Sequence, residues 1–440
     1  MKTFRIGGIH PAPCKMTAGS PATALPEPDV LTLLLGQSIG KPAKPLVKAG
    51  DMVTAGQLIA EADGLISANL HAPRAGKVSK IAKVRTQQGY WQDAIIIECD
   101  HLAPMPEFSG LTEKEVEDLA PAQIVEAVRN AGIVGLGGAT FPTAVKLTPP
   151  QGVTIDTIII NGVECEPYLT CDDRLMRERA RGIILGADLL RKAVNARSVL
   201  IGIEANKPEA LAAMREANRN YSHDYISVQE LKTKYPQGGE KQLIAALTGR
   251  EVPSGKLPAS VGVVVDNVAT AYAVYDAIYN GKPLIERYVT VTGSSLSAPC
   301  NLIAPIGVSV DELLVAAGGL PEDGTTQVIA GGPMMGRAIS ETGAPSVKGT
   351  SGILVMTGDK VHKKPEQPCI RCGRCVHGCP MGLEPYLLIA QARHGLWQEM
   401  KENAAMDCIE CGSCSWTCPS NKPLLDFIKL GKIEIRKQKL

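Results

Sequence analysis

Eight cysteines near the carboxyl end of the chain are spaced as ligands of iron–sulfur clusters. The two runs read Cys369-x2-Cys372-x2-Cys375-x3-Cys379-Pro380 and Cys408-x2-Cys411-x2-Cys414-x3-Cys418-Pro419. In such a run the first three thiolates cover one face of a four-iron cluster, and the fourth reaches a second cluster. Disulfides and zinc held by four thiolates are the alternatives, but a zinc ribbon uses neither a third Cys at the same step nor a following Pro. The spacing therefore predicts two [4Fe-4S] clusters.

The ligands of the two predicted clusters are crossed between the runs. The first cluster takes Cys369, Cys372, Cys375 and Cys418, and the second takes Cys408, Cys411, Cys414 and Cys379. Pro380 and Pro419 end the local helix, which leaves the preceding Cys free to face the far cluster. Apolar residues at helical spacing over 383–394 and 396–405 predict two short helices between the runs. We therefore expect a helical two-cluster ferredoxin module.

A glycine-rich stretch is the second segment that could hold a cofactor. It reads Gly135-Leu136-Gly137-Gly138-Ala139-Thr140-Phe141-Pro142-Thr143-Ala144-Val145-Lys146. It is not the dinucleotide fingerprint, because Thr140 stands where the third Gly belongs, and it is not a P-loop, because no Gly-Lys-Ser/Thr follows. Its glycines still let backbone N–H groups approach a flat anionic cofactor, and Lys146 adds a positive charge. Taken alone, such a loop could equally be structural.

Helix and strand patterns alternate from 121 to about 281, which is the signature of a parallel sheet covered by helices. Helices are expected over 122–131, 173–196, 208–220, 239–247 and 268–279, and strands over 157–161, 198–204, 225–231 and 261–265. Ligand sites in such sheets lie at the carboxyl ends of the strands. Three polar segments occupy those ends: Asn161-Gly-Val-Glu164-Cys-Glu166-Pro167, Tyr235-Pro-Gln-Gly238-Gly239-Glu240 and Asp266-Asn267-Val-Ala-Thr270.

The glycine-rich loop and these segments together resemble the flavin- and NADH-binding subunit of respiratory complex I. The resemblance implies that non-covalent FMN is held by Gly135, Gly137, Gly138, Lys146, Asn161, Asn267 and Thr270. It implies that the NADH cleft is lined by Phe141, Glu164, Glu166, Tyr235 and Glu240. The chain departs from that family in having Leu136 for an Arg, Val163 for an Asp, Gly239 for a Glu and Asp266 for an Asn. Polar contacts to the nucleotide are therefore expected to be fewer.

The flanking segments predict three further modules. Residues 45–84 resemble the barrel-sandwich fold of biotinyl and lipoyl carriers, but the tip reads Ser67-Ala68-Asn69-Leu70 and lacks a modifiable Lys, which indicates a scaffold. The strings at 288–293, 310–317 and 327–330 resemble a β-grasp-type module of the soluble-ligand-binding kind. The expected architecture is multidomain α/β plus β. It has a barrel-sandwich-like domain (1–110), a Rossmann-like FMN/NADH domain (111–283), the β-grasp-type module (284–340), a linker (341–368) and the cluster module (369–440).

Over nearly its whole length the chain is similar to the RnfC family of the Rnf complexes, which are membrane-bound, ion-pumping NAD:ferredoxin oxidoreductases. Strings that carry this similarity stand at 3–11, 137–143, 164–168 and 379–385. The similarity implies a relay in which NADH gives a hydride to FMN and single electrons leave through the clusters. It implies integral and anchored membrane subunits as partners, with ferredoxin reached through another subunit. It also implies a peripheral position on the cytoplasmic face of the bacterial cell membrane.

Two other functions fit parts of the sequence. A soluble flavin-dependent corrinoid reductase has similar modules, although the Met-Gly-Leu-Glu-Pro string after the first cysteine run favours the Rnf family. An electron-transfer adaptor with an inactive nucleotide site is the other, because the complex I Arg and Asp are missing.

Composition excludes several other classes. A formal net charge of +1 and the lack of a broad basic block argue against nucleic acid as a partner. The sequence has no apolar run of 18 residues and no amino-terminal signal, so we expect neither secretion nor membrane spans. The remaining cysteines show no pairing pattern, which fits a reducing cytoplasm. They are Cys14, Cys99, Cys165, Cys171 and Cys300.

Overall fold

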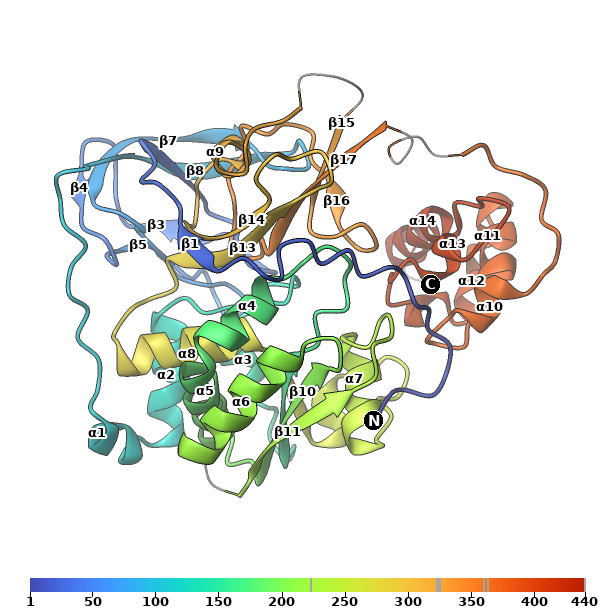
Figure 1. The fold of residues 1–440 in the computed structure, drawn as a ribbon, viewed down its shortest axis with the longest axis horizontal. Coiled ribbons are helices and arrows are strands. Elements are labelled where there is room, and N and C mark those ends of the chain that lie inside the picture. Colours follow the sequence, from blue (N-terminus) through green and yellow to red (C-terminus); the bar gives the residue numbers. More distant parts are fainter. Residues whose placement is uncertain (222–223, 322–325, 359–360, 362–363, 439–440) are drawn as a thin grey trace.

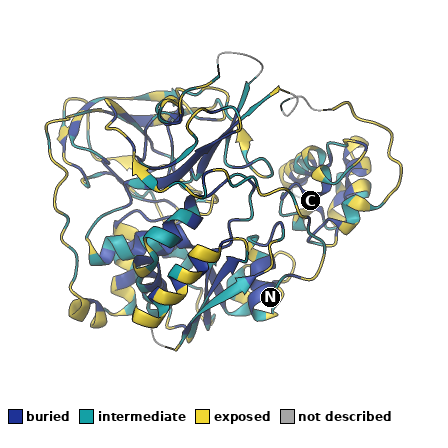
Figure 2. Cartoon of the chain, viewed as in Figure 1, coloured by how far each residue is buried: buried dark blue, intermediate teal, exposed yellow. Residues whose placement is uncertain are grey.

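The computed structural model describes residues 1–221, 224–321, 326–358, 361 and 364–438. These residues form an α/β domain, two β-rich modules that lie together above it, and a helical module at one side (Figure 1). Buried residues occupy the interior of each module (Figure 2). The helical module has its own apolar cluster, separate from the large core that the other modules share.

The α/β domain is built on four parallel strands in the order β11-β10-β9-β12. These strands are β9 (Thr157–Gly162), β10 (Ser198–Glu204), β11 (Ile226–Leu231) and β12 (Val263–Asn267). The helices are α1 (Glu113–Glu117), α2 (Pro121–Asn130), α3 (Thr143–Lys146), α4 (Cys171–Glu178), α5 (Ala180–Ala193), α6 (Pro208–Tyr221), α7 (Glu240–Thr248) and α8 (Val268–Tyr279). Ile158, Ile159 and Ile160 of β9 are fully buried, as expected for a parallel strand with helices on both faces.

The single helix expected over 173–196 is divided into α4 and α5 at Arg179. The backbone of Arg179 leaves the helical region, with φ −130° and ψ 27°. The Glu178 carboxylate accepts a hydrogen bond from Ala22 N at 2.9 Å, and the Arg179 guanidinium donates to Tyr288 Oη at 3.3 Å. Both partners belong to the neighbouring β-sheet, so tertiary contacts fix a break that the apolar spacing does not reveal.

The amino-terminal β module consists of two small sheets. One has the order β2-β8-β7-β4 and the other β3-β5-β6. The strands are β2 (Val30–Leu34), β3 (Lys44–Pro45), β4 (Met52–Val53), β5 (Leu58–Glu61), β6 (Leu70–His71), β7 (Gly76–Arg85) and β8 (Trp91–Cys99). The tip that carries a modifiable Lys in carrier domains is packed inward here. Asn69 donates to Asn130 O of α2 at 3.2 Å, and Asn69 O accepts from Lys348 Nζ at 2.6 Å. These contacts support a scaffold role.

The second β module is a six-stranded sheet in the order β1-β14-β13-β17-β15-β16. Its elements are β1 (Ala22–Ala24), β13 (Glu286–Thr292), β14 (Cys300–Pro305), α9 (Val310–Ala316), β15 (Thr326–Ala330), β16 (Arg337–Ala338) and β17 (Gly352–Thr357). Strand β17 lies between β13 and β15, and Ile353, Leu354 and Val355 are buried. The prediction of a linker from 341 is therefore wrong for residues 341–357. The Gly, Ser, Thr and Lys of the segment concealed a short apolar strand.

Residues 2–24, which we call the N-terminal segment, connect three modules. Lys2 forms a bridge with Leu231 at the end of β11, and Ile9 forms one with Tyr235. Gly8 N donates to Gly378 O of the helical module at 3.1 Å, and β1 pairs with β14. The segment therefore lies outside the barrel-sandwich module to which residues 1–110 were assigned. Figure 1 shows it running from the N-terminus past the helical module to β1.

The helical module is built from short helices, as the sequence predicts. They are α10 (Arg374–His377), α11 (Pro385–Arg393), α12 (Trp397–Glu402), α13 (Ser413–Trp416) and α14 (Leu424–Lys437). Leu424, Ile428 and Ile435 of α14 turn inward and pack with the module's own core. Across the described part of the chain, no helix combines the length and apolar character needed to cross a membrane.

Candidate functional site

The carboxyl ends of β9 and β12 bring several predicted FMN residues together. Asn161 and Asn267 are partners in the β9/β12 register. The glycine-rich loop lies over this edge, because Leu136 N donates to Thr270 Oγ1 at 2.9 Å. A Cβ added to Gly137 would lie 3.4 Å from Asn267 Cβ, so the loop backbone approaches the strand end closely. The structure thus places Gly137, Asn161, Asn267 and Thr270 at one site.

The tip of the glycine-rich loop is shaped for close approach by a ligand. Gly135 N donates to Phe141 O at 2.8 Å, and Thr140 N donates to Gly135 O at 3.1 Å, which close the loop. Gly138 has φ +113°, a conformation that L side chains rarely adopt, and a Cβ there would meet no atom within 4 Å. Open space beside an exposed backbone fits a planar cofactor. The residues of this edge therefore fit the predicted FMN.

Lys146, predicted to contact FMN, is held by groups at the end of β12. Its Nζ donates to Val265 O at 2.8 Å and forms an ion pair with Asp266 Oδ1 at 3.4 Å. Burial raises the pKa of the Asp266 carboxyl, and Lys146 opposes that rise. Burial also raises the pKa of Glu240, which faces the same two charges. Lys146 thus balances buried carboxylates at the end of β12 and is already engaged there.

Glu164 is buried and caps helix α4. Its carboxylate accepts hydrogen bonds from Asp172 N at 3.0 Å and Asp173 N at 3.4 Å, which satisfies free N–H groups of the first helical turn. The sequence predicted Glu164 for the NADH cleft, whereas the geometry gives its carboxylate this capping role. Phe141, a second residue predicted for that cleft, is half-buried in the closed loop.

Asp172 belongs to the site although its sequence pattern did not single it out. Its Oδ2 accepts a hydrogen bond from Asn267 Nδ2 at 2.6 Å. Burial, with the negative charge of Glu164 as the next cause, raises the pKa of Asp172 to about 7, and the Asn267 bond opposes the rise. A carboxyl that keeps its proton near neutral pH can donate as well as accept at this edge.

Lys15 of the N-terminal segment holds the 164–169 strand-to-helix connection from outside the domain. Its Nζ donates to the carbonyl oxygens of Glu164 at 2.8 Å, Glu166 at 2.9 Å and Leu169 at 2.5 Å. Burial lowers the pKa of Lys15, and the charge of Glu164 opposes that effect. One ammonium group therefore fixes the backbone that carries two residues predicted for the NADH cleft.

Glu166 and Tyr235 lie where three modules meet. The Glu166 carboxylate accepts from Met334 N at 2.7 Å and Met335 N at 2.9 Å, both in the six-stranded module. Tyr235 is buried, and its Oη donates to Cys411 O of the helical module at 2.7 Å. Burial raises the pKa of both groups. Tyr235 thus links the α/β domain directly to a predicted cluster ligand.

The predicted ligands of the second cluster surround one cavity. Cys379, Cys408, Cys411 and Cys414 all line it, together with apolar residues that include Leu383 and Ile428. Burial raises the pKa of Cys408 to about 11 and that of Cys414 to about 12. Among the described residues no three His, Cys, Asp or Glu side chains converge closely enough to hold a single ion. A four-iron cluster needs wider spacing, because each thiolate binds a different iron.

The predicted ligands of the first cluster lie nearer the surface. Cys369 and Cys372 are exposed, whereas Cys375 and Cys418 are half-buried. Burial raises the pKa of Cys375, and Cys418 from the other run is close enough to add to that rise. This pairing fits the crossed arrangement for the first cluster as well.

Comparison with known proteins matches each module in turn. The chain matches the RnfC barrel sandwich hybrid domain over residues 2–102 and the Nuo51 FMN-binding domain over 128–276. It matches the SLBB domain over 288–338 and a 4Fe-4S dicluster domain over 368–422. One subunit of the proton-translocating ferredoxin:NAD(+) oxidoreductase complex of Clostridium ljungdahlii is 44% identical over 405 residues, covering 91% of this chain and 87% of that protein.

The chain belongs to the RnfC family. One subunit of the Na(+)-translocating ferredoxin:NAD(+) oxidoreductase complex of Acetobacterium woodii is 42% identical over 438 residues, covering 99% of this chain and 98% of that protein. The NAD+-reducing [NiFe]-hydrogenase in the H2-reduced state shares the fold, with a TM-score of 0.50 at 20% identity over 74% of this chain and 63% of that one.

Membership in the RnfC family confirms the predicted fold class and cofactors. The FMN-binding match includes the glycine-rich loop, β9 and β12, and the dicluster match includes all eight cysteines. The chain is an oxidoreductase subunit with sites for FMN and [4Fe-4S] clusters. Which residues contact FMN and NADH remains a prediction.

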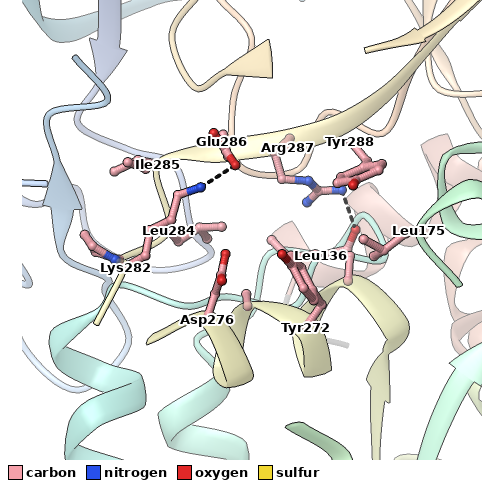
Figure 3. A pocket seen from close by; sticks show the side chains of 13 residues that line it. Leu136, Leu175, Tyr272, Asp276, Lys282, Leu284, Ile285, Glu286, Arg287 and Tyr288 are labelled. Carbon is pink, nitrogen blue, oxygen red and sulfur yellow. Dashed lines mark hydrogen bonds and ion pairs between the residues drawn. The ribbon is translucent and has the colours of Figure 1, made fainter. Parts of the chain in front are cut away.

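A pocket of this RnfC protein lies behind the glycine-rich loop. It is lined by Tyr272 and Asp276 of α8 and by the chain entering β13 (Figure 3). At one end Arg287 donates to Leu136 O at 3.2 Å, and at the other Lys282 pairs with Glu286. None of the residues predicted to contact FMN or NADH lines this pocket. From this side the buried Arg287 of β13 supports the loop backbone.

The raised pKa of Asp172 predicts a pH-dependent stability. The folded protein keeps a proton that the unfolded chain releases between about pH 4 and 7, so the free energy of unfolding should fall as pH rises through that window, by up to about 1.4 kcal/mol per pH unit. Asp172→Asn should flatten this slope in denaturant titrations of flavin-free protein. Asp118→Asn, at the exposed end of α1, is the control. Equal slopes in the wild type and in Asp172→Asn would contradict the raised pKa.

Proposed function

We propose that this subunit exchanges electrons between NAD(H) and FMN in the α/β domain and passes them singly through two [4Fe-4S] clusters to membrane partner subunits. FMN, when bound, takes two electrons as a hydride and returns them one at a time. The named activities of the relatives from Clostridium ljungdahlii and Acetobacterium woodii support this assignment. Coupling to ion translocation then belongs to the partner subunits, and ferredoxin is reached through one of them.

The contact that carries the proposal is the Tyr235 hydrogen bond to Cys411. Two hydrogen bonds and a packing contact lead to it from the strand end. Asn161 donates to Gly238 O at 2.9 Å, and Gly238 N donates to Cys165 Sγ at 3.4 Å, beside Tyr235. This favours the cluster of Cys408, Cys411, Cys414 and Cys379 as the one next to FMN. The more exposed cluster of Cys369 is then the outer one.

The residues around the site position the cofactor and exclude water. Lys15 and Arg287 fix backbone carbonyls on either side of the strand end. Glu166 joins the α/β domain to the six-stranded module, and Tyr235 closes the route toward the helical module. We propose a peripheral attachment to the membrane complex through protein contacts of the helical module, on the cytoplasmic face.

Rapid mixing of the reconstituted subunit with NADH tests the proposal. The flavin absorbance should bleach first, and cluster absorbance should decrease afterwards. Tyr235→Phe removes the hydroxyl that reaches Cys411 and keeps the ring, so cluster reduction should slow about fivefold relative to flavin bleaching, the factor that corresponds to about 1 kcal/mol. Tyr288→Phe, which loses a buried hydroxyl contact far from Cys411, is the matched control.

Two outcomes would contradict the proposed function. A flavin that NADH does not bleach would show that the nucleotide site is inactive and would favour the adaptor function. Reduction of the Cys369 cluster before the Cys408 cluster, seen in freeze-quenched paramagnetic spectra, would reverse the proposed order.

A further inference from the structure

The two cysteine loops of the helical module are repeats of one structure. They read Cys369-Ile-Arg-Cys-Gly-Arg-Cys and Cys408-Ile-Glu-Cys-Gly-Ser-Cys. Arg371 has φ +54° and the equivalent Glu410 has φ +59°, while Gly373 and Gly412 have φ +73° and +77°. Each loop is followed by a single helical turn, α10 or α13. The chain therefore shows the same backbone in two different surroundings.

The loop of the second cluster is covered by the rest of the protein. Ile409 packs against Ile9 and Tyr235, and Cys411 O accepts the Tyr235 hydrogen bond. A Cβ added to Gly412 would lie 2.9 Å from Met334 O, so the six-stranded module also touches this loop. This loop is the surface on which the α/β domain rests.

The loop of the first cluster has no such cover from the described part of the chain. Ile370, the equivalent of Ile409, is 68% exposed, and Cys369 and Cys372 are exposed beside it. Arg371 and Arg374 are exposed too, and neither forms an ion pair with any residue that the structure describes.

The charged residue of the covered loop is paired within the described part of the protein, whereas those of the uncovered loop are not. In the covered loop Glu410 is paired with Lys432 at 2.7 Å, and Ser413 is buried. Near the uncovered loop, the Glu366 carboxylate is already shared by Arg393 and Lys422, which hold its pKa low, at about 2. Glu384, another acid in the described part of this module, is exposed and contacts Tyr386. Within that described set, two arginines are therefore left to attract negative charge next to an exposed isoleucine and two exposed cluster ligands.

We propose that the loop 369–375 is the docking surface for an acidic protein that carries its own one-electron centre. The partner covers Ile370 and pairs with Arg371 and Arg374, as the α/β domain covers the equivalent loop 408–414. Charge complementarity selects an acidic partner and also speeds its encounter. This inference rests on the proposed function. In the overall reaction, NADH and two oxidised carriers give NAD+, one proton and two reduced carriers. Each encounter with the partner moves one electron, and the reaction can run in either direction.

The test uses a variant whose loop sequence already occurs, with the same backbone conformation, in the second cysteine loop of this chain. Arg371→Glu with Arg374→Ser converts 369–375 into the sequence of 408–414, where Glu has the same positive φ. Its net charge falls by three, from two for Arg to Glu and one for Arg to Ser. The control is Arg129→Glu with Arg219→Ser, which makes the same change at exposed sites on α2 and α6.

Binding is measured by calorimetry with a small acidic bacterial ferredoxin as the probe, which stands in for the acidic electron-carrying partner subunit. The wild type should bind it, with affinity that falls as salt is raised. The loop variant should bind about tenfold more weakly and lose most of the salt dependence, while the control should match the wild type. Equal affinities for wild type and loop variant would overturn the proposal. So would loss of iron from the loop variant, because the two loops would then not be equivalent.

Electron transfer gives the second measurement. With pre-reduced ferredoxin as donor and NAD+ as acceptor, the loop variant should be about tenfold slower than the control. With NADH as donor and cytochrome c, a basic carrier, as acceptor, the loop variant should not be slower. Slowing with both carriers would mean a structural role and overturn the docking proposal. A third measurement is sedimentation with phosphatidylglycerol vesicles. If the wild type and the control sediment with the vesicles, the loop variant does not, and all three react with ferredoxin at the same rate, then the arginines bind lipid and the docking proposal is overturned.

These outcomes are separable from those that test the proposed function. Failure of NADH to bleach the flavin in the wild type contradicts the proposed function, whatever the loop binds. Normal bleaching with no difference between the loop variant and the control contradicts only the docking surface.

Discussion

Cys379→Ser should remove about half of the roughly eight irons and leave the Cys369 cluster in place. Cys379 is buried and lines one cavity with Cys408 and Cys411, although Cys375 is its nearest cysteine in the sequence. Burial already raises the pKa of the Cys408 and Cys414 thiols in this cavity, so loss of one ligand leaves groups that favour the neutral, non-binding form. Iron analysis and paramagnetic spectra of the reduced protein measure the effect.

Cys418→Ser is the matched variant in the other run. It should leave the cluster of Cys408, Cys411 and Cys414 and remove the one bound by Cys369. If each substitution instead abolished the cluster of its own run, the ligands would not be crossed, and the cavity at Cys379 would need another explanation.

Gly138→Val should give folded protein with both clusters and no FMN. Gly138 has φ +113° and open space where a Cβ would stand, at the tip of the loop above Asn267. A branched side chain there occupies the space that the cofactor would fill, and the backbone conformation adds strain of about 1 to 3 kcal/mol. Flavin content after desalting should fall from about one per chain to nearly none.

Gly152→Val is the control that separates the effect of backbone strain from the effect of blocking the FMN site. Gly152 lies in the same domain with φ +84° and also has no atom within 4 Å of an added Cβ, but it is outside the site. This variant should carry a similar strain and keep its FMN. Retention of FMN in Gly138→Val, or equal loss from both variants, would contradict the assignment of the loop to the cofactor.

The sequence-based predictions were most accurate for features whose residues lie close together in the sequence. The cysteine spacings and the glycine pattern each lie within a dozen residues, and the structure brings those residues together. Lys146 was assigned to FMN because it follows the glycine-rich loop, but its ion pair with Asp266 spans 120 positions. No local pattern indicates that a lysine is already neutralised by a strand end so far along the chain.

Residues missed from the sequence act across still longer separations. Lys15 contacts carbonyls about 150 positions away, and Arg287 contacts Leu136 O across 151. Glu164 was predicted for the nucleotide because it follows β9, yet it caps α4 seven residues later, where Thr170 at the N-cap makes no side-chain cap bond. In the sequence Thr170 is an ordinary N-cap residue, so no local pattern indicated that a carboxylate from elsewhere caps this helix.

The N-terminal segment affects how this protein is made. A ribosome synthesises residues 2–24 long before their partners at Leu231, Tyr235, β14 and Gly378, which lie in the second half of the chain. The segment therefore lacks its final contacts while the α/β domain folds, and its contacts with the helical module form last. Because the segment lies against the backbone of Cys379 and packs against Cys411, we expect nascent chains that lack iron to expose an unpaired amino-terminal strand to chaperones and proteases.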